Sequence, residues 1–208
     1  MLEVTWLLFI IASLVLIITP GQDMILVMSR SIAQGSAAGV ATAAGVSIGL
    51  VGHTILATLG LGAVLRASEW LFLVFKLAGA AYLVYLGVQL VRSRAQAFSV
   101  SGGKPKSLGR LFFDGAFSNI SNPKIAIFYF AFLPQFVKPG AVHPTVSIFA
   151  LGILFAGLTF LVKGPVGLTA GMLSSWLRSR PKRLTWLYRT SGTILIGLGV
   201  KLALAQRS

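Results

Sequence analysis

The chain has 208 residues, of which 56% are hydrophobic and 11% are charged, and its mean hydropathy is +0.87. An ordinary soluble domain carries about 25% charged residues, so this composition excludes a water-soluble globule and predicts an integral membrane protein. The 18 Lys and Arg against 4 Asp and Glu give a net charge of +14, but the basic residues stand between the apolar runs, which favours contact with anionic lipids over binding of nucleic acid.

Six apolar stretches are long enough to cross a membrane, which takes about 20 residues of helix. In chain order they are residues 4–28, 37–64, 70–91, 111–137, 145–168 and 186–205. The N-terminus lacks a basic segment, so the first stretch is expected to be a retained span and not a signal peptide. We predict an all-α polytopic membrane protein with six transmembrane helices in a single membrane domain, residues 1–208.

The basic residues also predict the orientation of the spans. Basic residues gather in the loops after the first, third and fifth spans, which the positive-inside rule places in the cytoplasm. Both termini are then expected on the periplasmic side of the inner membrane. The residues on the predicted cytoplasmic side are Arg30, Arg92, Arg94, Lys104, Lys106, Arg110, Arg178, Arg180, Lys182 and Arg183, and those on the other side are Arg66, Lys138 and Arg207.

Two of the predicted spans contain a break. Pro20-Gly21 interrupts the first span and Asn122-Pro123 interrupts the fourth. Proline removes a backbone donor and frees a carbonyl one turn earlier, and in hydrocarbon such groups must face protein or a water-lined cavity. Half-helix N-termini suit a carboxylate and exposed carbonyls suit an ammonium group, so the breaks favour a zwitterion site. The alternative is that each break is a packing kink.

Matching offsets indicate an internal repeat. Pro123 lies 103 positions after Pro20, and Gly152 lies 103 positions after Gly49. In the third and sixth spans, Gly192 and Gly199 follow Gly79 and Gly87 by 113 and 112 positions. The expected halves are residues 1–92 and 110–208, joined by a cytoplasmic linker, residues 93–109. Three spans in each half require opposite insertion, and inverted repeats with broken helices are typical of transporters.

Asp23 is the best ionisable candidate, because a carboxylate within a span is costly and functional by default. The alternative is that it caps the helix that follows the break. Lys124 is expected to pair with Asp23 or to attract a substrate carboxylate, or else to extend to the membrane surface. Asn119 and Asn122 are expected to face inwards, where they satisfy the break or bind ligand.

Other polar residues in the spans have simpler explanations. Asp114 is expected to form an ion pair with Arg110 one turn earlier, and His53 is expected to be a buried, hydrogen-bonded group. The small residues Gly45 and Gly49 predict a close helix contact. Lys163, directly before Gly164-Pro165, is unusual in an apolar run.

Four segments together resemble the LysE/RhtB family of amino-acid exporters over essentially the whole chain. They are "ITPGQDM", "GVSIGL", "KLAGAAYLVYLGVQLVR" and "FDGAFSNISNPKIAIFYFAFLPQF". The resemblance implies an inner-membrane protein that exports amino acids in exchange with protons. It singles out Pro20, Gly21, Asp23, Asn122, Pro123 and Lys124 as site residues. Many members carry a proline at the position of Gln22, so the first break here retains an additional backbone donor.

We therefore predict a secondary-active exporter of amino acids or related small metabolites. No nucleotide-binding motif is present, so the energy is expected to come from the proton motive force or the substrate gradient, and the resemblance favours coupling to protons. The expected partners are the substrate, protons, anionic lipids and a second copy in a homodimer. A cadmium-type cation exporter is the alternative, although no Cys and only two His are available as soft ligands. An intramembrane enzyme is a remote alternative that lacks a nucleophile–base spacing. Neither a cofactor nor a metal site is expected, and the absence of Cys excludes a thiol-redox carrier.

Overall fold

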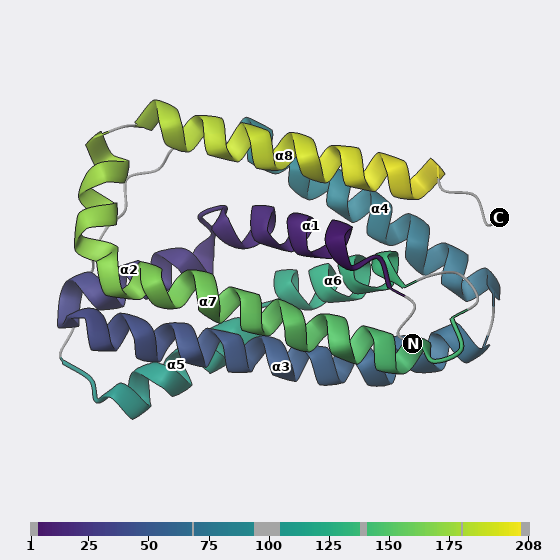
Figure 1. The fold of residues 1–208 in the computed structure, drawn as a ribbon, viewed down its shortest axis with the longest axis horizontal. Coiled ribbons are helices and arrows are strands. Elements are labelled where there is room, and N and C mark those ends of the chain that lie inside the picture. The colour runs from purple at the N-terminus through teal and green to yellow at the C-terminus, as the bar shows by residue number, and fades with distance from the viewer. Residues whose placement is uncertain (1–3, 68, 94–104, 138–140, 180, 205–208) are drawn as a thin grey trace.

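The computed structural model describes residues 4–67, 69–93, 105–137, 141–179 and 181–204 (Figure 1). Apart from an isolated bridge between Val4 and Val137, the regular structure of these residues is helical. The helices are α1 (Trp6–Ile18), α2 (Gln22–Gln34), α3 (Ser36–Ala67), α4 (Glu69–Arg92), α5 (Leu108–Ile120), α6 (Pro123–Phe132), the 3₁₀ helix η1 (Leu133–Phe136), α7 (Pro144–Ser179) and α8 (Pro181–Leu204). Most of the linker and the basic residues Arg94, Lys104, Lys138, Arg180 and Arg207 lie outside the described residues.

The long helices form two groups, with shorter helices between them. Helix α3 packs along α7 and α5, and α4 packs along α8. Figure 1 shows α8 and α4 along one side of the molecule and α7, α3 and α5 along the other, with α1 and α6 between the two groups. One half of each broken helix, α1 and α6, therefore lies between the two groups.

Several helices have the length and apolar character of membrane spans. Within the described residues, Ser36–Gly60 in α3 and Pro144–Ala170 in α7 each qualify alone, and α1 and α2 qualify together as a bent pair. The segment Leu77–Arg92 of α4 is apolar but shorter. The all-α, membrane-compatible character is thus confirmed, while the number of six spans stays a prediction.

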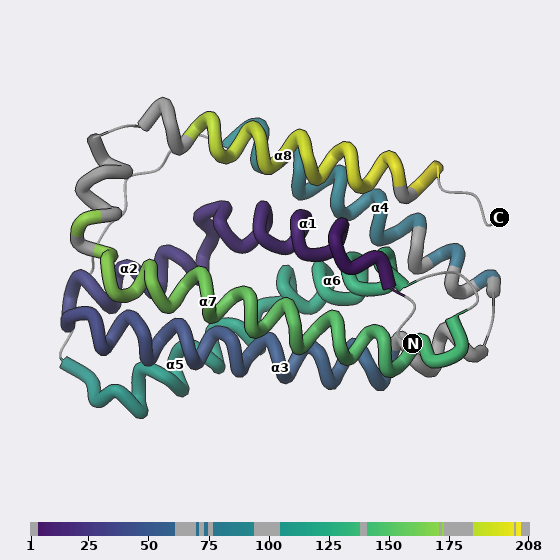
Figure 2. The backbone as a smooth tube through the Cα atoms, in the orientation of Figure 1, coloured from purple at the N-terminus to yellow at the C-terminus, as the bar shows by residue number. Residues whose placement is uncertain are grey.

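Both breaks that the sequence predicts are present. The axes of α1 and α2 differ by 51° across the first break, where Figure 2 shows the chain turning sharply. Gly21 is the N-cap of α2 in an extended conformation and provides no side-chain cap. At the second break, Asn122 caps α6 by accepting a hydrogen bond of 3.0 Å from the Lys124 N–H. Pro123 takes the first helical position, where its missing N–H costs nothing.

Glycines allow the closest helix contacts. A side chain at Gly45 would overlap the backbone of Phe112 in α5, and a Cβ at Gly49 would lie 2.9 Å from the Ala116 carbonyl oxygen. The predicted close contact at Gly45 and Gly49 is therefore confirmed, with α5 as the neighbour. In the other group, a Cβ at Gly87 of α4 would lie 2.6 Å from the Gly192 carbonyl oxygen of α8.

Five phenylalanines, which we call the aromatic cluster, fill the core on one side of the first break. They are Phe9, Phe128, Phe132, Phe136 and Phe155. Their ring centroids lie 4.7 Å apart for Phe128 and Phe132, and 5.1 Å apart for Phe9 and Phe136. Beside them, the Thr5 N–H donates a hydrogen bond of 3.0 Å to the Phe136 carbonyl. The start of α1 is therefore tied to η1 by rings and backbone together.

Candidate functional site

A cavity of about 280 Å³ lies between the broken helices and the long helices around them. Its mouth is formed by exposed polar or small residues, among them Gly21, Gln22, Gln89 and Lys124. Its interior is formed by buried residues, and two of these, Asp23 and Lys163, are charged. The rest of the lining is Leu16, Ile17, Thr19, Pro20, Leu50, Leu86, Leu90, Ser93, Asn122, Ile125, Phe128, Phe155, Thr159 and Leu195.

Asp23 lies in the first turn of α2 and lines the cavity, but it does not cap the helix, because Gly21 is the N-cap and no side-chain cap hydrogen bond is formed. Only 7% of the residue is exposed. Its Oδ2 atom accepts hydrogen bonds from the Asn119 side-chain amide at 2.9 Å and from the Lys163 amine at 3.2 Å. Its Oδ1 atom is buried and has no hydrogen-bond partner among the described residues. The protein thus donates hydrogen bonds to one carboxylate oxygen, while the other oxygen can still accept them.

Lys163 comes from α7 and is 8% exposed. A buried ammonium group is tolerated only with a counter-charge, and Asp23 provides it across 140 positions of sequence. Of the roles predicted for Lys124, the pairing with Asp23 is not formed, because Lys163 is the partner and Lys124 is exposed at the cavity mouth. The Lys124 carbonyl instead accepts a hydrogen bond of 3.1 Å from the Tyr82 hydroxyl. The contact of Lys124 with a substrate carboxylate stays a prediction.

Asn119 lies behind Asp23 and does not line the cavity. It is fully buried, and its backbone carbonyl lies 3.1 Å from Nε2 of His53. His53 is therefore the buried, hydrogen-bonded group that the sequence predicts. The contact with His53 holds the backbone of Asn119, while its side-chain amide donates to one oxygen of Asp23.

The two breaks meet at the cavity mouth. The Asn122 side-chain amide donates a hydrogen bond of 3.2 Å to the side-chain oxygen of Gln22. Of the predicted site residues, the structure brings Pro20, Gly21, Asp23, Asn122 and Lys124 to the cavity wall, while Asn119 and Pro123 are not part of that wall.

At the first break, the cavity wall includes the positive N-terminal end of helix α2. The backbone N–H groups of the first turn of a helix have no partner within the helix, and in α2 no side-chain cap satisfies them. Because Gly21, Gln22 and Asp23 line the cavity, this positive helix end faces the same space as the Asp23 carboxylate. A ligand with one positive and one negative group could contact both.

Lys163 is the main residue that sequence reasoning left unassigned. The available signal was a single lysine inside an apolar run of 27 residues. Thr159, one turn earlier on the same helix, also lines the cavity. Thr19 lines it too, and its hydroxyl bonds to that of Ser191 in α8 at 2.6 Å.

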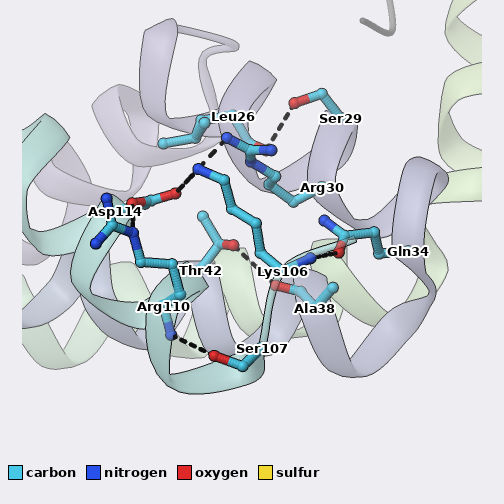
Figure 3. Close-up of polar contacts among 10 residues, drawn as sticks. All are labelled: Leu26, Ser29, Arg30, Gln34, Ala38, Thr42, Lys106, Ser107, Arg110 and Asp114. Carbon is cyan, nitrogen blue, oxygen red and sulfur yellow. Dashed lines mark hydrogen bonds and ion pairs between the residues drawn. The ribbon is translucent and has the colours of Figure 1, made fainter. Parts of the chain in front are cut away.

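A second group of charges lies at the far end of α2 (Figure 3). Asp114 of α5 forms ion pairs with Arg110 at 3.1 Å and with Arg30 of α2 at 3.8 Å, and its carboxylate also accepts a hydrogen bond from Lys106. The predicted pairing of Asp114 with Arg110 is confirmed. We call Arg30, Lys106, Arg110 and Asp114 the charged cluster. It joins α2 to α5 and to the segment before α5, and none of its members lines the cavity.

Comparison with known proteins identifies the family. Residues 14–206 match the family described as LysE type translocator. The chain belongs to this family. It is 32% identical to a homoserine/homoserine lactone efflux protein of Salmonella typhimurium strain LT2, over 98% of both chains. It is 31% identical to the uncharacterized membrane protein PA4757 of Pseudomonas aeruginosa, over 96% of this chain and 95% of that one.

The chain is also 31% identical to the uncharacterized membrane protein YrhP of Bacillus subtilis, over 91% of this chain and 94% of that one. No solved structure matches the chain significantly. As a member of the LysE-type translocators, the protein is a membrane transporter and not an enzyme. The predicted family membership is thus confirmed.

Proposed function

We propose that this LysE-type transporter exports an amino acid or a related small metabolite across the inner membrane, in exchange for protons. The observation that carries the proposal is the buried ion pair of Asp23 and Lys163 in the wall of a cavity that both helix breaks border. Buried charges within a membrane protein are costly and mark substrate or proton pathways. The relative named as a homoserine/homoserine lactone efflux protein supports a small substrate derived from an amino acid.

The cavity supplies complementary groups for a zwitterion. The free Oδ1 atom of Asp23 accepts a hydrogen bond from the substrate ammonium, and the uncapped N-terminus of α2 attracts its carboxylate. Phe128, Phe155 and neighbouring aliphatic residues form an apolar wall for the substrate side chain. The volume of about 280 Å³ lies just below the range of about 300–1,000 Å³ for drug-sized ligands, which favours a substrate of amino-acid size.

The transporter is built of two inverted halves with three spans each. Packing between α4 and α8 supports this symmetry. Close contacts join Gly87 to Gly192, and Gly199 to Ala80. Gly199 lies 112 positions after Gly87, and Gly192 lies 112 positions after Ala80, so a shift by the repeat length exchanges the two contacts. The broken helices α1–α2 and α5–α6 then occupy equivalent positions in the halves.

Access to the cavity alternates between the two sides of the membrane. Ser93, where α4 ends and the linker begins, lines the cavity, so the cavity reaches the end of the fold assigned to the cytoplasm. Towards the other end, Phe128 and Phe155 of the lining belong to the aromatic cluster, which acts as the outer seal. Export requires the two halves to rock so that this seal opens and the cytoplasmic mouth closes.

The cadmium-type alternative fits the cavity less well. Asp23 is the one carboxylate in the described lining, and Lys163 already places a positive charge beside it. A divalent cation prefers several anionic or soft ligands, so an ammonium group matches this site better than a metal ion.

Transport by the purified protein tests the proposal. Liposomes are loaded with one unlabelled compound, and uptake of the same labelled compound is followed, with homoserine, threonine, leucine, lysine and Cd²⁺ as the panel. Counterflow of at least one amino acid, and its loss in Asp23→Asn, is expected. Flux of Cd²⁺ alone, or no flux of any compound by a folded protein, would contradict the proposal.

A further inference from the structure

The contacts proposed for a zwitterionic substrate assign no role to Lys163. Its amine lies 3.2 Å from the Oδ2 atom of Asp23, and the residue lines the cavity. A charged lysine in the middle of α7 destabilises a membrane helix, and an apolar residue would fill its place without that cost. The position of Lys163 therefore calls for a role in transport.

Substrate and Lys163 compete for one carboxylate. Asn119 and Lys163 both donate to Oδ2 of Asp23, whereas the buried Oδ1 has no hydrogen-bond partner among the described residues and can accept another donor. A substrate ammonium group at Oδ1 would be the second cation on a single carboxylate. Two cations within about 4–6 Å disfavour each other's charged form strongly in a site with little water. Lysine can relieve the repulsion by losing a proton, whereas arginine stays charged.

Other charged or titratable groups near the pair are few. Of the described residues, Lys124 of α6 shares the cavity but is exposed at its mouth, and His53 of α3 is separated from Asp23 by Asn119. Asp23 of α2 is thus the charged group that directly faces Lys163. Loss of the proton from Lys163 leaves the substrate ammonium as the one cation at Asp23, while the substrate carboxylate lies at the N-terminus of α2.

We propose that Lys163 carries the exchanged proton, and that substrate and protonated Lys163 take turns as the counter-charge of Asp23; this rests on the proposed function. On the cytoplasmic side, substrate binds Asp23, an N–H bond of Lys163 breaks, its electron pair stays on nitrogen and the proton passes to water in the cavity. On the outer side the substrate leaves, and the neutral amine takes a proton from water and pairs with Asp23 again. One substrate leaves the cell for each proton that enters.

Asn119 acts as a positioning residue in this cycle. Its side-chain amide donates 2.9 Å to Oδ2 of Asp23, and its own backbone is held at His53. The carboxylate therefore keeps one donor when Lys163 moves away, and its orientation is retained for the substrate.

The first test uses the wild-type protein in detergent. Substrate binding is expected to release a proton, measured by calorimetry in buffers of different ionisation heat. The infrared difference spectrum of binding should show no loss of a protonated carboxyl band, because the proton comes from an amine. Loss of such a band would identify Asp23 as the proton carrier and would overturn the proposal.

The second test compares variants in liposomes by counterflow and by export driven by a pH gradient. Lys163→Gln should retain counterflow, because the substrate ammonium then neutralises Asp23 alone. In this variant, the pH dependence of gradient-driven export should shift to a more acidic outer pH. The returning empty transporter then carries its proton on a carboxylate instead of an amine, and carboxylates accept protons at lower pH than amines do. Lys163→Arg should lose both activities by about tenfold or more, because its permanent charge holds Asp23. Lys201→Gln, on the exposed last turn of α8, is the matched control and should behave as wild type.

The outcomes separate this proposal from the proposed function. A folded Lys163→Gln with an unchanged pH profile, or a Lys163→Arg with normal transport, would overturn the role of Lys163 and leave amino-acid export intact. Absence of counterflow in the wild-type protein would overturn the proposed function and this role together.

Discussion

The side-chain amide of Asn122 donates a hydrogen bond of 3.2 Å to the side-chain oxygen of Gln22, so the two helix breaks are joined directly at the cavity mouth. Asn122 also caps α6, whereas Gln22 has no capping role. Removing either residue removes the link, but only removal of Asn122 exposes the end of a helix.

This asymmetry gives a prediction for stability. Gln22→Ala should lower the free energy of unfolding by about 0.5–1.5 kcal/mol, the net value of one hydrogen bond. Asn122→Ala should lower it further by about 0.5–2 kcal/mol, the value of an N-cap. Asn122→Ser keeps a capping side chain and should match Gln22→Ala. Thermal unfolding in detergent measures all three, and equal effects of Gln22→Ala and Asn122→Ala would contradict the capping argument.

The buried pair predicts a non-additive response. Asp23→Asn leaves Lys163 buried without a counter-charge, and breaking a buried ion pair from one side costs about 3–5 kcal/mol. The double change Asp23→Asn with Lys163→Gln removes both charges and should recover much of that stability, while amino-acid export stays lost. A double-mutant cycle on unfolding and counterflow checks this. Additive losses of stability would show that the two side chains do not interact.

Local sequence signals explain what could be predicted of this fold and site. Pro20-Gly21 and Asn122-Pro123 break their helices because of backbone chemistry within a few residues, and Arg110 and Asp114 meet because they are one turn apart. The partner of Asp23 could not be predicted in this way, since Lys163 is 140 positions away.

The pairing of Asp23 with Lys163 depends on the packing of α2 against α7, which brings the two side chains to one cavity. In that packing the Ser31 hydroxyl of α2 donates a hydrogen bond of 2.5 Å to the Gly167 carbonyl of α7, and Gly39 of the adjoining α3 approaches Gly167 closely. Neither contact has a periodicity that a single sequence reveals. Long-range helix packing therefore decided which lysine joined the site.

The glycine contact of α4 and α8 allows a matched comparison. In Gly87→Ala the new Cβ would lie 2.6 Å from the Gly192 carbonyl oxygen, so the helices must separate and the free energy of unfolding should fall by about 1–3 kcal/mol, as for other overpacked sites. Gly197→Ala, on the exposed face of α8 with no atom within 4 Å of its Cβ, should be neutral or stabilising by up to about 1 kcal/mol. Thermal unfolding of the two variants measures the difference. A Gly87→Ala variant that is more stable than Gly197→Ala would contradict the close contact between α4 and α8.

The charged cluster of Figure 3 predicts a dependence on salt. Asp114→Asn leaves Arg30, Lys106 and Arg110 without their shared carboxylate. Because partly exposed ion pairs contribute about 0–1 kcal/mol each, the loss of stability should be modest at low salt. It should shrink further at high salt, where charges are screened beyond about 3 Å at 1 M. Arg110→Gln, which removes the most exposed cation of the cluster, should have a smaller effect. A loss that does not change with salt would rule out an electrostatic role.

Phe128 and Phe155 belong both to the cavity wall and to the aromatic cluster. A substrate side chain that presses on these two rings therefore acts on the same surface that must part for release. We expect bulkier side chains to change how fast the transporter turns over more than how tightly it holds its cargo. Discrimination by size would then appear in the maximal rate, with the half-saturating concentration nearly constant across a series of aliphatic amino acids.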